Sequence, residues 1–248
     1  MRAADKFDLS VVTVTYNELG NIKLLIRILF DFFKKKRING EVIIVDDNSP
    51  DGTAKEVKRL SKKYKSINLI VRPTKLGIAS AYRDGINSAK GRIIVAMDAD
   101  FSHPPSKIPD LYKAADNNMI AFGSRYIGKK IFETDFAHYI GTTILNKYIN
   151  YVLKSGIADN TNGFFAIKSK QLRKIRAYTN RFGIDPFANI LWGITVGAAA
   201  KKLGMTVIEI ETPYKQRNYG RSKISPIEGI NIVMDNIIFS TRLKKLFK

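Results

Sequence analysis

The chain has 248 residues, of which 45% are hydrophobic, and this is enough apolar material for a packed α/β domain. It contains no cysteine, which excludes disulfides and thiolate metal sites, and its formal net charge of +20 favours an anionic partner: a nucleic acid, an anionic membrane or a phosphate-rich substrate. No zinc-finger, basic-zipper or RNA-binding aromatic pattern occurs, so sequence-specific nucleic-acid binding is disfavoured.

The first hundred residues alternate between short apolar runs, which predict strands, and stretches of helical periodicity. Strands are expected at residues 9 to 14, 42 to 45, 68 to 71 and 92 to 97, and helices at residues 18 to 33, 52 to 64 and 78 to 89. Asn17 is the expected N-cap of the first helix and Asp51 of the second. Because strands and helices alternate with short links, we expect a parallel sheet with right-handed crossovers.

The remaining elements follow a less regular order. Helices are expected at residues 104 to 117, 137 to 153, 169 to 177 and 186 to 202, strands at 119 to 122 and 206 to 210, and a loop at 160 to 163. We expect one compact domain over residues 1 to 224 and a basic, amphipathic C-terminal helix over residues 225 to 248. That helix either lies on a membrane surface or packs on the domain, and both interpretations stay open.

Two features concern the location of the protein. Residues 1 to 8 lack the apolar stretch of a secretory signal, so a cytoplasmic protein is expected. The longest uncharged stretch, residues 186 to 200, has 15 residues, whereas a membrane-spanning helix needs about 20. We therefore expect a buried helix there and not a membrane span.

Acidic residues stand at the ends of three predicted strands. Glu18 follows the first strand, Asp46 and Asp47 end the second, and Asp98 and Asp100 follow the fourth. The carboxyl ends of parallel strands share one edge of a sheet, so these acids should converge on one crevice. The carboxylates of residues 98 and 100 repel each other unless a cation lies between them, and Mg²⁺ or Mn²⁺ suits such oxygen donors and leaves positions for substrate phosphates. The pattern predicts nucleotide-diphosphate chemistry.

The end of the first strand has no glycine-rich phosphate loop. Thr15-Tyr16-Asn17-Glu18 stands where a dinucleotide-binding fold would place G-x-G-x-x-G, and no P-loop occurs there either. A nicotinamide enzyme and a P-loop ATPase are therefore disfavoured. A tyrosine and an acid at this edge are able to hold a base and a ribose.

Six segments of the sequence form a recognisable set. They are residues 11 to 18, 45 to 53, 75 to 77, 97 to 105, 123 to 126 and 220 to 223. In this order they resemble the dolichol-phosphate mannose synthase group of family 2 glycosyltransferases, over about residues 8 to 224. The resemblance implies a GT-A fold with a mainly parallel central sheet flanked by helices. It also implies inverting transfer of a hexosyl group, mannose from GDP-mannose, to dolichyl or polyprenyl phosphate.

The resemblance further implies roles for single residues near the nucleotide. Tyr16, Glu18 and Asp47 would contact the nucleotide, and Asp46 would be the neighbour of Asp47 on the same turn. Asp98 would face the ribose or the metal.

The metal ligands implied by the resemblance are Asp98 and Asp100, with Ser102 helping and Mg²⁺ or Mn²⁺ as the cofactor. A divalent ion and basic side chains would stabilise the charge on the departing nucleoside diphosphate. A phosphate acceptor is already anionic at neutral pH, so no strong general base is required.

Phosphate contacts are implied for Arg125 and for three residues of a basic glycine loop, Arg217, Ser222 and Lys223. The sequence departs from the family pattern at Val14, where a proline is usual, and at residues 159 to 164.

Other functions stay open beside the main hypothesis. The donor could be UDP-glucose, or the acceptor a saccharide, which would need a carboxylate base that the sequence does not identify. A basic nucleic-acid-binding protein that uses its charge and not its acids is the remote alternative. For the main hypothesis we expect a peripheral protein on the cytoplasmic face of a membrane, bound to the lipid surface or to a separate membrane subunit.

Overall fold

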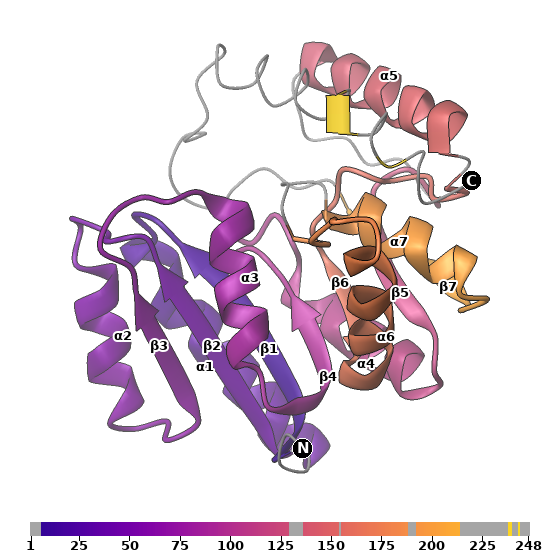
Figure 1. The fold of residues 1–248 in the computed structure, drawn as a ribbon. Coiled ribbons are helices and arrows are strands. Elements are labelled where there is room, and N and C mark those ends of the chain that lie inside the picture. Colours follow the sequence, from indigo (N-terminus) through magenta and orange to yellow (C-terminus); the bar gives the residue numbers. More distant parts are fainter. Residues whose placement is uncertain are drawn as a thin grey trace.

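The computed structural model describes residues 6–128, 136–153, 155–187, 192–213, 238–239 and 243. Within these residues, seven strands form one sheet: β1 (Phe7–Thr15), β2 (Gly40–Asp46), β3 (Ile67–Val71), β4 (Gly91–Ala96), β5 (Ile120–Ser124), β6 (Phe165–Lys168) and β7 (Val207–Glu211). Their order is β3-β2-β1-β4-β6-β5-β7 (Figure 1). All neighbouring strands are parallel except where β6 runs antiparallel to β4 and β5. The predicted α/β class with a mainly parallel sheet is confirmed.

The described helices are α1 (Leu19–Lys36), α2 (Thr53–Ser61), α3 (Ile78–Ser88), α4 (Ile108–Asp116), α5 (Phe136–Leu153), α6 (Ser169–Asn180) and α7 (Trp192–Lys202), with a short 3-10 turn, η1 (Pro105–Lys107), before α4. The helix expected to begin at residue 186 is described from Trp192 onward, and residues 186 and 187 form a turn. The helix expected over residues 104 to 117 is divided between η1 and α4, with Pro105 and Pro109 each near the start of its element.

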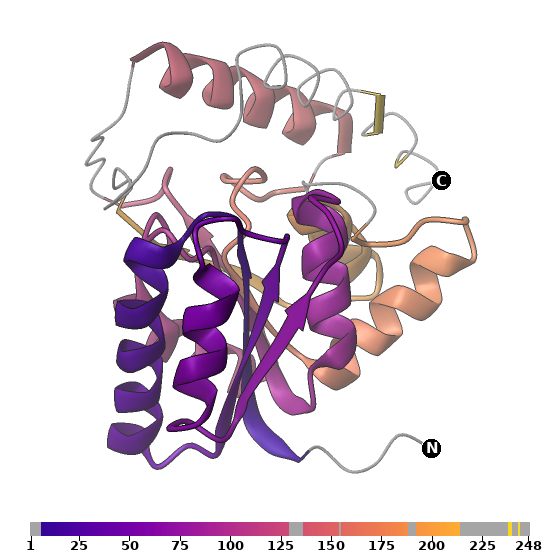
Figure 2. The ribbon, with the colours of Figure 1, turned by 90° about the vertical axis from the view of Figure 1, so that its left-hand side faces the viewer.

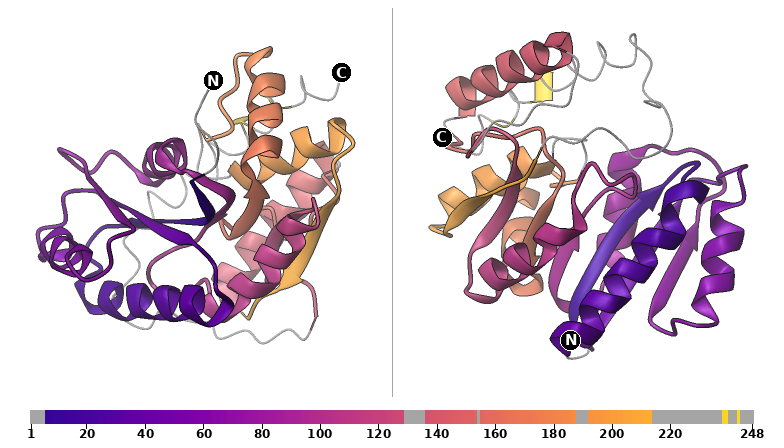
Figure 3. Two further views of the ribbon diagram at one scale, coloured as in Figure 1. Left: turned by 90° about the horizontal axis from the view of Figure 1, so that it is seen from below. Right: turned by 180° about the vertical axis from the view of Figure 1, so that it is seen from behind.

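Alternate side chains of the strands point to opposite faces of the sheet, and each face has its own core. One core lies under α1, α2 and α4 and includes Val11, Ile44 and Val95. The other lies under α3, α6 and α7 and includes Val12 and Ile43 with further strand residues. Seen from below in Figure 3, the helices lie on both sides of the sheet. This three-layer arrangement leaves the carboxyl edge of the parallel strands accessible to a ligand.

Strand β6 is absent from the sequence prediction, which had a loop at residues 160 to 163, a helix from residue 169 and no element between them. The strand has only four residues, too few to show a periodic pattern, and it becomes a strand by pairing with β4 and β5. Because β6 is antiparallel, it begins at the edge where its neighbours end. The loop before β6 therefore reaches the same edge as the acidic strand ends.

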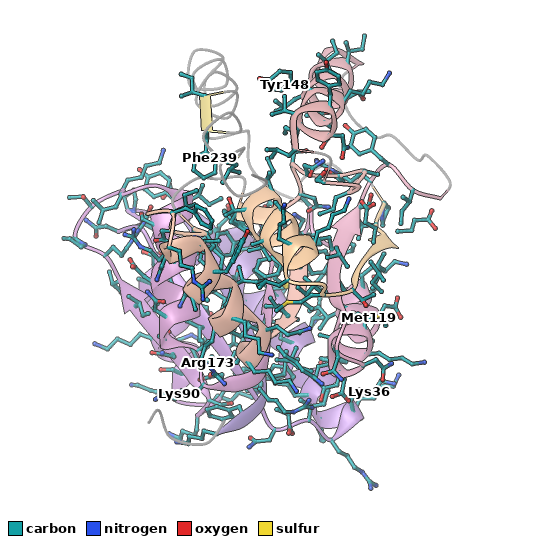
Figure 4. The ribbon with its side chains drawn as sticks, turned by 45° about the vertical axis from the view of Figure 1, so that its right-hand side comes forward. Lys36, Lys90, Met119, Tyr148, Arg173 and Phe239 are labelled. Atoms are coloured by element: carbon teal, nitrogen blue, oxygen red, sulfur yellow. The ribbon has the colours of Figure 1, made fainter. Side chains whose placement is uncertain are left out.

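Helix α5 lies beyond the carboxyl edge of the sheet (Figures 1 and 2). Its inner side, with Leu145, Ile149 and Leu153, packs against Ile194 of α7 and against Leu243 near the C-terminus. Phe239 packs against the same cluster, and Figure 4 shows Phe239 and Tyr148 at this end of the molecule, with Lys36 and Lys90 at the other. Across the described residues, every helix falls short of the length and apolarity needed to cross a membrane.

Candidate active site

The candidate site lies at the carboxyl edge of the sheet, where β1, β2 and β4 end side by side (Figure 1). Asp46 is the last residue of β2 and pairs with Thr15 at the end of β1. Asp98 and Asp100 follow β4, the strand on the other side of β1. The topology therefore brings together the acids that the sequence placed on three strand ends.

Asp46 is fully buried, and its carboxylate accepts hydrogen bonds from neighbouring residues of the protein. Its Oδ1 accepts hydrogen bonds from Thr15 Oγ1 at 2.8 Å and Ser49 Oγ at 2.6 Å, and its Oδ2 accepts one from the Ser49 N–H at 2.8 Å. Asp46 therefore fastens the ends of β1 and β2 to the following turn. A contact between Asp46 and the nucleotide stays a prediction.

The beginnings of α1 and α2 are joined by Asp51. Its Oδ1 accepts from the Thr53 N–H at 2.9 Å, and its Oδ2 accepts from the Leu19 N–H at 3.0 Å. The N-cap of α2 is Gly52 and not the predicted Asp51, which lies one residue earlier. The predicted N-cap of α1, Asn17, instead has a left-handed backbone with φ of 57°, and Glu18 occupies the cap position. Glu18 is 8% exposed and accepts a 2.7 Å hydrogen bond from Asn21.

Asp47 forms a buried ion pair with Arg72, which follows β3. The same guanidinium donates to Ser80 Oγ at 2.6 Å and to the Gly77 carbonyl at 2.8 Å. Asp47 Oδ2 also accepts from the Gly77 N–H at 3.3 Å. Arg72 and Asp47 thus fix the loop before α3 against the end of β2.

The same loop reaches the end of β1 through a cation–π contact. The Lys75 ammonium lies 4.9 Å from the centre of the Tyr16 ring. Tyr16, Asp47 and Lys75 therefore line one part of the edge, which places an aromatic face, an acid and a cation close together.

Asp98 is held by two neutral groups. Tyr82 Oη donates a 2.7 Å hydrogen bond to Asp98 Oδ1, and His103 Nδ1 accepts a 2.9 Å hydrogen bond from the Asp98 backbone N–H. Because Nδ1 is the acceptor, a neutral His103 carries its proton on Nε2. Burial, followed by the charge of Asp98, raises the pKa of Tyr82 well above its usual value, so the hydroxyl remains a donor. The Asp98 side chain is 31% exposed.

Asp100 is held from its own loop. Its Oδ1 accepts from the Ser102 N–H at 3.0 Å and from Ser102 Oγ at 2.6 Å. Phe101, between them, has a left-handed backbone with φ of 67°, which turns the chain back so that Ser102 reaches Asp100. The three residues expected around a divalent ion, Asp98, Asp100 and Ser102, therefore lie in one short segment after β4, in which Ser102 contacts Asp100 directly.

Arg125 follows β5 and is engaged by the loop before β6. Its Nε and Nη2 donate to Asp159 at 2.7 Å and 2.8 Å, and Nη2 also donates to Thr161 Oγ1 at 2.7 Å. The Asp159 side chain is fully buried. The Glu209 carboxylate on β7 accepts hydrogen bonds from the backbone N–H groups of Ala158 and Asp159. In this structure Arg125 anchors that loop, and a contact with phosphate stays a prediction.

Arg217, Ser222 and Lys223, the three other residues expected at phosphate, lie outside the described residues. In the part of the chain that is described, no group of three or more His, Asp or Glu side chains is arranged to hold a metal ion. Two of the acids expected around a metal ion, Asp98 and Asp100, are described at this edge, and their role as ligands stays a prediction.

The sequence did not predict three residues that hold this edge in place: Arg72, which pairs with Asp47; Tyr82, which donates to Asp98; and Asp159, which pairs with Arg125. Arg72 follows a predicted strand, as the acids do, so a basic strand end was a usable signal. Tyr82 lies within an amphipathic helix and had the pattern of a core residue, so no local signal was available. Asp159 depends on the position of β6.

Comparisons with known proteins agree with this architecture. The chain is 32% identical over 220 residues to dolichol-phosphate mannosyltransferase from Pyrococcus furiosus, an alignment that covers 87% of this chain and 58% of that protein. It is 34% identical over 167 residues to the protein of the same name from Saccharomyces cerevisiae, covering 66% of this chain and 61% of that protein. The chain thus spans about three fifths of the length of these two relatives. Undecaprenyl-phosphate mannosyltransferase from Micrococcus luteus is 28% identical, with 85% of both chains covered.

Among solved structures, glucosyl-3-phosphoglycerate synthase from Mycobacterium tuberculosis, in complex with Mn²⁺ and UDP, matches with a TM-score of 0.63. The match covers 97% of this chain and 80% of that one at 15% identity, so it shows the shared fold. The model of the family described as glycosyl transferase family 2 matches residues 10–176. This span covers the acidic strand ends, the turn of Asp98 to Ser102 and the Arg125–Asp159 pair, and the chain belongs to glycosyl transferase family 2.

Proposed function

We propose that this protein transfers mannose from GDP-mannose to a polyprenyl phosphate, with inversion at the anomeric carbon. The observation that carries the proposal is the pair Asp98 and Asp100 at the end of the central strand β4, beside the strand ends that carry Tyr16, Glu18 and Asp47. The names of the relatives from three organisms support mannose as the sugar and a lipid phosphate as the acceptor.

The donor set at β4 fits a divalent cation. Two carboxylates and a hydroxyl on one turn are hard oxygen donors, which suit Mg²⁺ and Mn²⁺. We assign Asp98 and Asp100 as its ligands, with Ser102 orienting Asp100. A divalent ion bound there would supply stabilisation of the negative charge on the leaving diphosphate. The related fold that was solved with Mn²⁺ and UDP supports this assignment.

The nucleotide is assigned to the edge formed by Tyr16, Glu18 and Asp47. The Tyr16 ring gives a flat face for a base, and the carboxylates accept hydrogen bonds from base N–H groups or ribose hydroxyls. Asp46 acts behind this surface by fixing the turn that presents Asp47.

Transfer requires the acceptor phosphate to approach the sugar opposite the diphosphate. An acceptor oxygen bonds to the anomeric carbon as the bond to the diphosphate oxygen breaks, and GDP leaves. The acceptor phosphate is already anionic, so no side chain has to remove a proton. We assign Arg125, Arg217, Ser222 and Lys223 to phosphate binding, and Arg125 is already placed at this edge by Asp159.

A membrane surface is the proposed source of the acceptor. Helix α5 lies beyond the carboxyl edge and exposes Ile140, Ile144 and Tyr151, three residues on one side of the helix that are 40%, 63% and 85% exposed. Its opposite side packs against Leu243 near the C-terminus. We propose that α5 rests on the cytoplasmic face of a membrane, which would bring a lipid phosphate to the site. Apart from residues 238, 239 and 243, the C-terminal helix expected over residues 225 to 248 lies outside the described residues.

The test is a transfer assay with Mn²⁺ or Mg²⁺, radiolabelled GDP-mannose and a short polyprenyl phosphate, in which label is followed into the organic phase. UDP-glucose is used in a parallel reaction to identify the donor. Asp100→Asn is expected to lower product formation at least about a hundredfold, because a ligand of the divalent ion loses its charge.

The matched control is Asp116→Asn, which removes a partly exposed carboxylate paired with Arg92 away from the site. It should keep transfer within about twofold of wild type, as expected for a surface pair. Full activity of a folded Asp100→Asn variant would contradict the assignment at β4. Absence of lipid-linked label with both donors for the wild-type protein would contradict the proposed reaction.

A further inference from the structure

We infer that Tyr82 is a positioning residue for the divalent-cation site: it orients Asp98 by a hydrogen bond to one carboxylate oxygen and leaves the carboxylate its charge. The inference rests on the proposed function, because it concerns how that site is held. Tyr82 lies on α3, outside the segment that carries the acids, and its hydroxyl donates a hydrogen bond to Asp98.

The Tyr82 hydroxyl is fixed before any ligand arrives. The side chain is fully buried, and its ring packs against the Trp192 ring with centres 4.5 Å apart. Trp192 is itself buried, and a Cβ built on Gly163 would lie 2.7 Å from its ring, so the indole has little room to move. The donor to Asp98 therefore sits on a packed aromatic pair that joins α3 to α7.

The backbone of Asp98 is fixed from the other side. His103 Nδ1 accepts a hydrogen bond from the Asp98 backbone N–H, and the His103 ring stacks on the Phe164 ring with the ring centres 5.1 Å apart. Tyr82 and His103 together hold one oxygen and the backbone of Asp98. His103 Nδ1 is 3.6 Å from Oδ2, too far for a hydrogen bond, and the side chain remains 31% exposed.

The chemical nature of these partners separates Asp98 from Asp47 and Asp159, two other acids at the same edge. Asp47 and Asp159 are each paired with an arginine, which neutralises their charge. The groups that hold Asp98 are a phenol and an imidazole that accepts a hydrogen bond, and neither is cationic. A neutral donor orients a carboxylate without compensating its charge, which is what a cation ligand requires.

The experiment compares Tyr82→Phe with wild type in the full chain. Binding of Mn²⁺ in the presence of GDP is measured from the electron paramagnetic resonance signal of free Mn²⁺. Removing the hydroxyl should weaken Mn²⁺ binding about tenfold, as expected for an outer partner of a metal ligand. In the transfer assay the Mn²⁺ concentration for half-maximal rate should rise by the same factor, and the rate at saturating Mn²⁺ should recover.

Tyr112→Phe is the matched control, because Tyr112 is a partly buried tyrosine on α4 whose hydroxyl meets Arg92 and not the site. Its Mn²⁺ affinity should equal that of wild type. In an Asp98→Asn background, Tyr82→Phe should cause no further loss of Mn²⁺ affinity, because the hydroxyl acts on the metal only through the Asp98 carboxylate.

Four results would overturn the inference. Equal Mn²⁺ affinity of Tyr82→Phe and wild type would show that the hydrogen bond is dispensable. Tyr82→Phe would have a merely structural role if it lowered Mn²⁺ affinity as much in the Asp98→Asn background as in the wild-type chain. The same conclusion would follow if its loss of Mn²⁺ affinity came with partial unfolding, seen by circular dichroism. Wild-type protein that binds neither Mn²⁺ nor GDP would instead overturn the proposed function, and this inference with it.

Discussion

Arg72 shows how one side chain can stabilise a candidate nucleotide edge without touching a ligand. Its guanidinium and the carboxylate of Asp47 are 4% and 8% exposed, so both charges are removed from water. The pair is satisfied by further hydrogen bonds to Ser80 and Gly77. Breaking such a pair is costly because the remaining charge stays buried without a partner.

Arg72→Ala is therefore expected to lower the free energy of unfolding by about 3 to 5 kcal/mol, measured by urea denaturation. The control is Arg92→Ala, which removes an arginine from an ion pair with Asp116 at 37% and 48% exposure and should cost less than about 1 kcal/mol. Similar losses for the two variants would argue that the Arg72 pair is as weak as a surface pair.

At the scale of elements, the position of α3 decides where Tyr82 and the loop after β3 lie. The helix approaches the sheet at Gly85, where a built Cβ would lie 2.5 Å from Val12 Cγ1 and 3.0 Å from Val45 Cγ2. Both valines are buried in the core under α3, so neither has room to move aside. The glycine allows close contact between α3 and the strands.

Gly85→Ala should lower the free energy of unfolding by about 1 to 3 kcal/mol, since overpacking outweighs the better helix propensity of alanine. Gly141→Ala tests the opposite case within α5, because no atom lies within 4 Å of its built Cβ. That variant should be neutral or more stable by up to about 1 kcal/mol. Thermal unfolding of both variants checks the pair, and a stabilising Gly85→Ala would refute the close-packing argument.

For the whole molecule, the net positive charge and the exposed apolar side of α5 both favour the membrane surface proposed above. The chain has 42 basic and 22 acidic residues, which favours an anionic surface at low ionic strength. Helix α5 adds an exposed apolar side beyond the sheet's carboxyl edge. Electrostatic attraction and shallow apolar insertion together are the usual basis of peripheral membrane binding.

Ile144→Glu is expected to weaken binding to vesicles of anionic phospholipid about tenfold, because it places a charge on the exposed side of α5. Flotation at two salt concentrations measures this effect, and wild-type binding should fall as salt rises. Leu203→Glu is the control: Leu203 is 36% exposed and precedes β7, at the amino edge of the sheet. Equal flotation of wild type and Ile144→Glu would place the contact elsewhere.

The sequence by itself determined the α/β class, the acidic strand ends and the family resemblance. These features are local: strand and helix periodicity, turn residues and the spacing of Asp98 and Asp100 are properties of short segments. Parallel strands then bring their carboxyl ends to one edge by topology alone, so the convergence of the acids could be foreseen.

Only the tertiary structure decided the partners of each carboxylate. Asp46 and Asp47 are neighbours in sequence, yet one is buried among hydroxyl and amide donors and the other pairs with Arg72, 25 residues away. Strand β6 likewise formed from a segment too short to show periodicity, and its antiparallel direction brought Asp159 to Arg125. Such pairings depend on which segments meet across the folded sheet, and that information is not present in any short stretch of sequence.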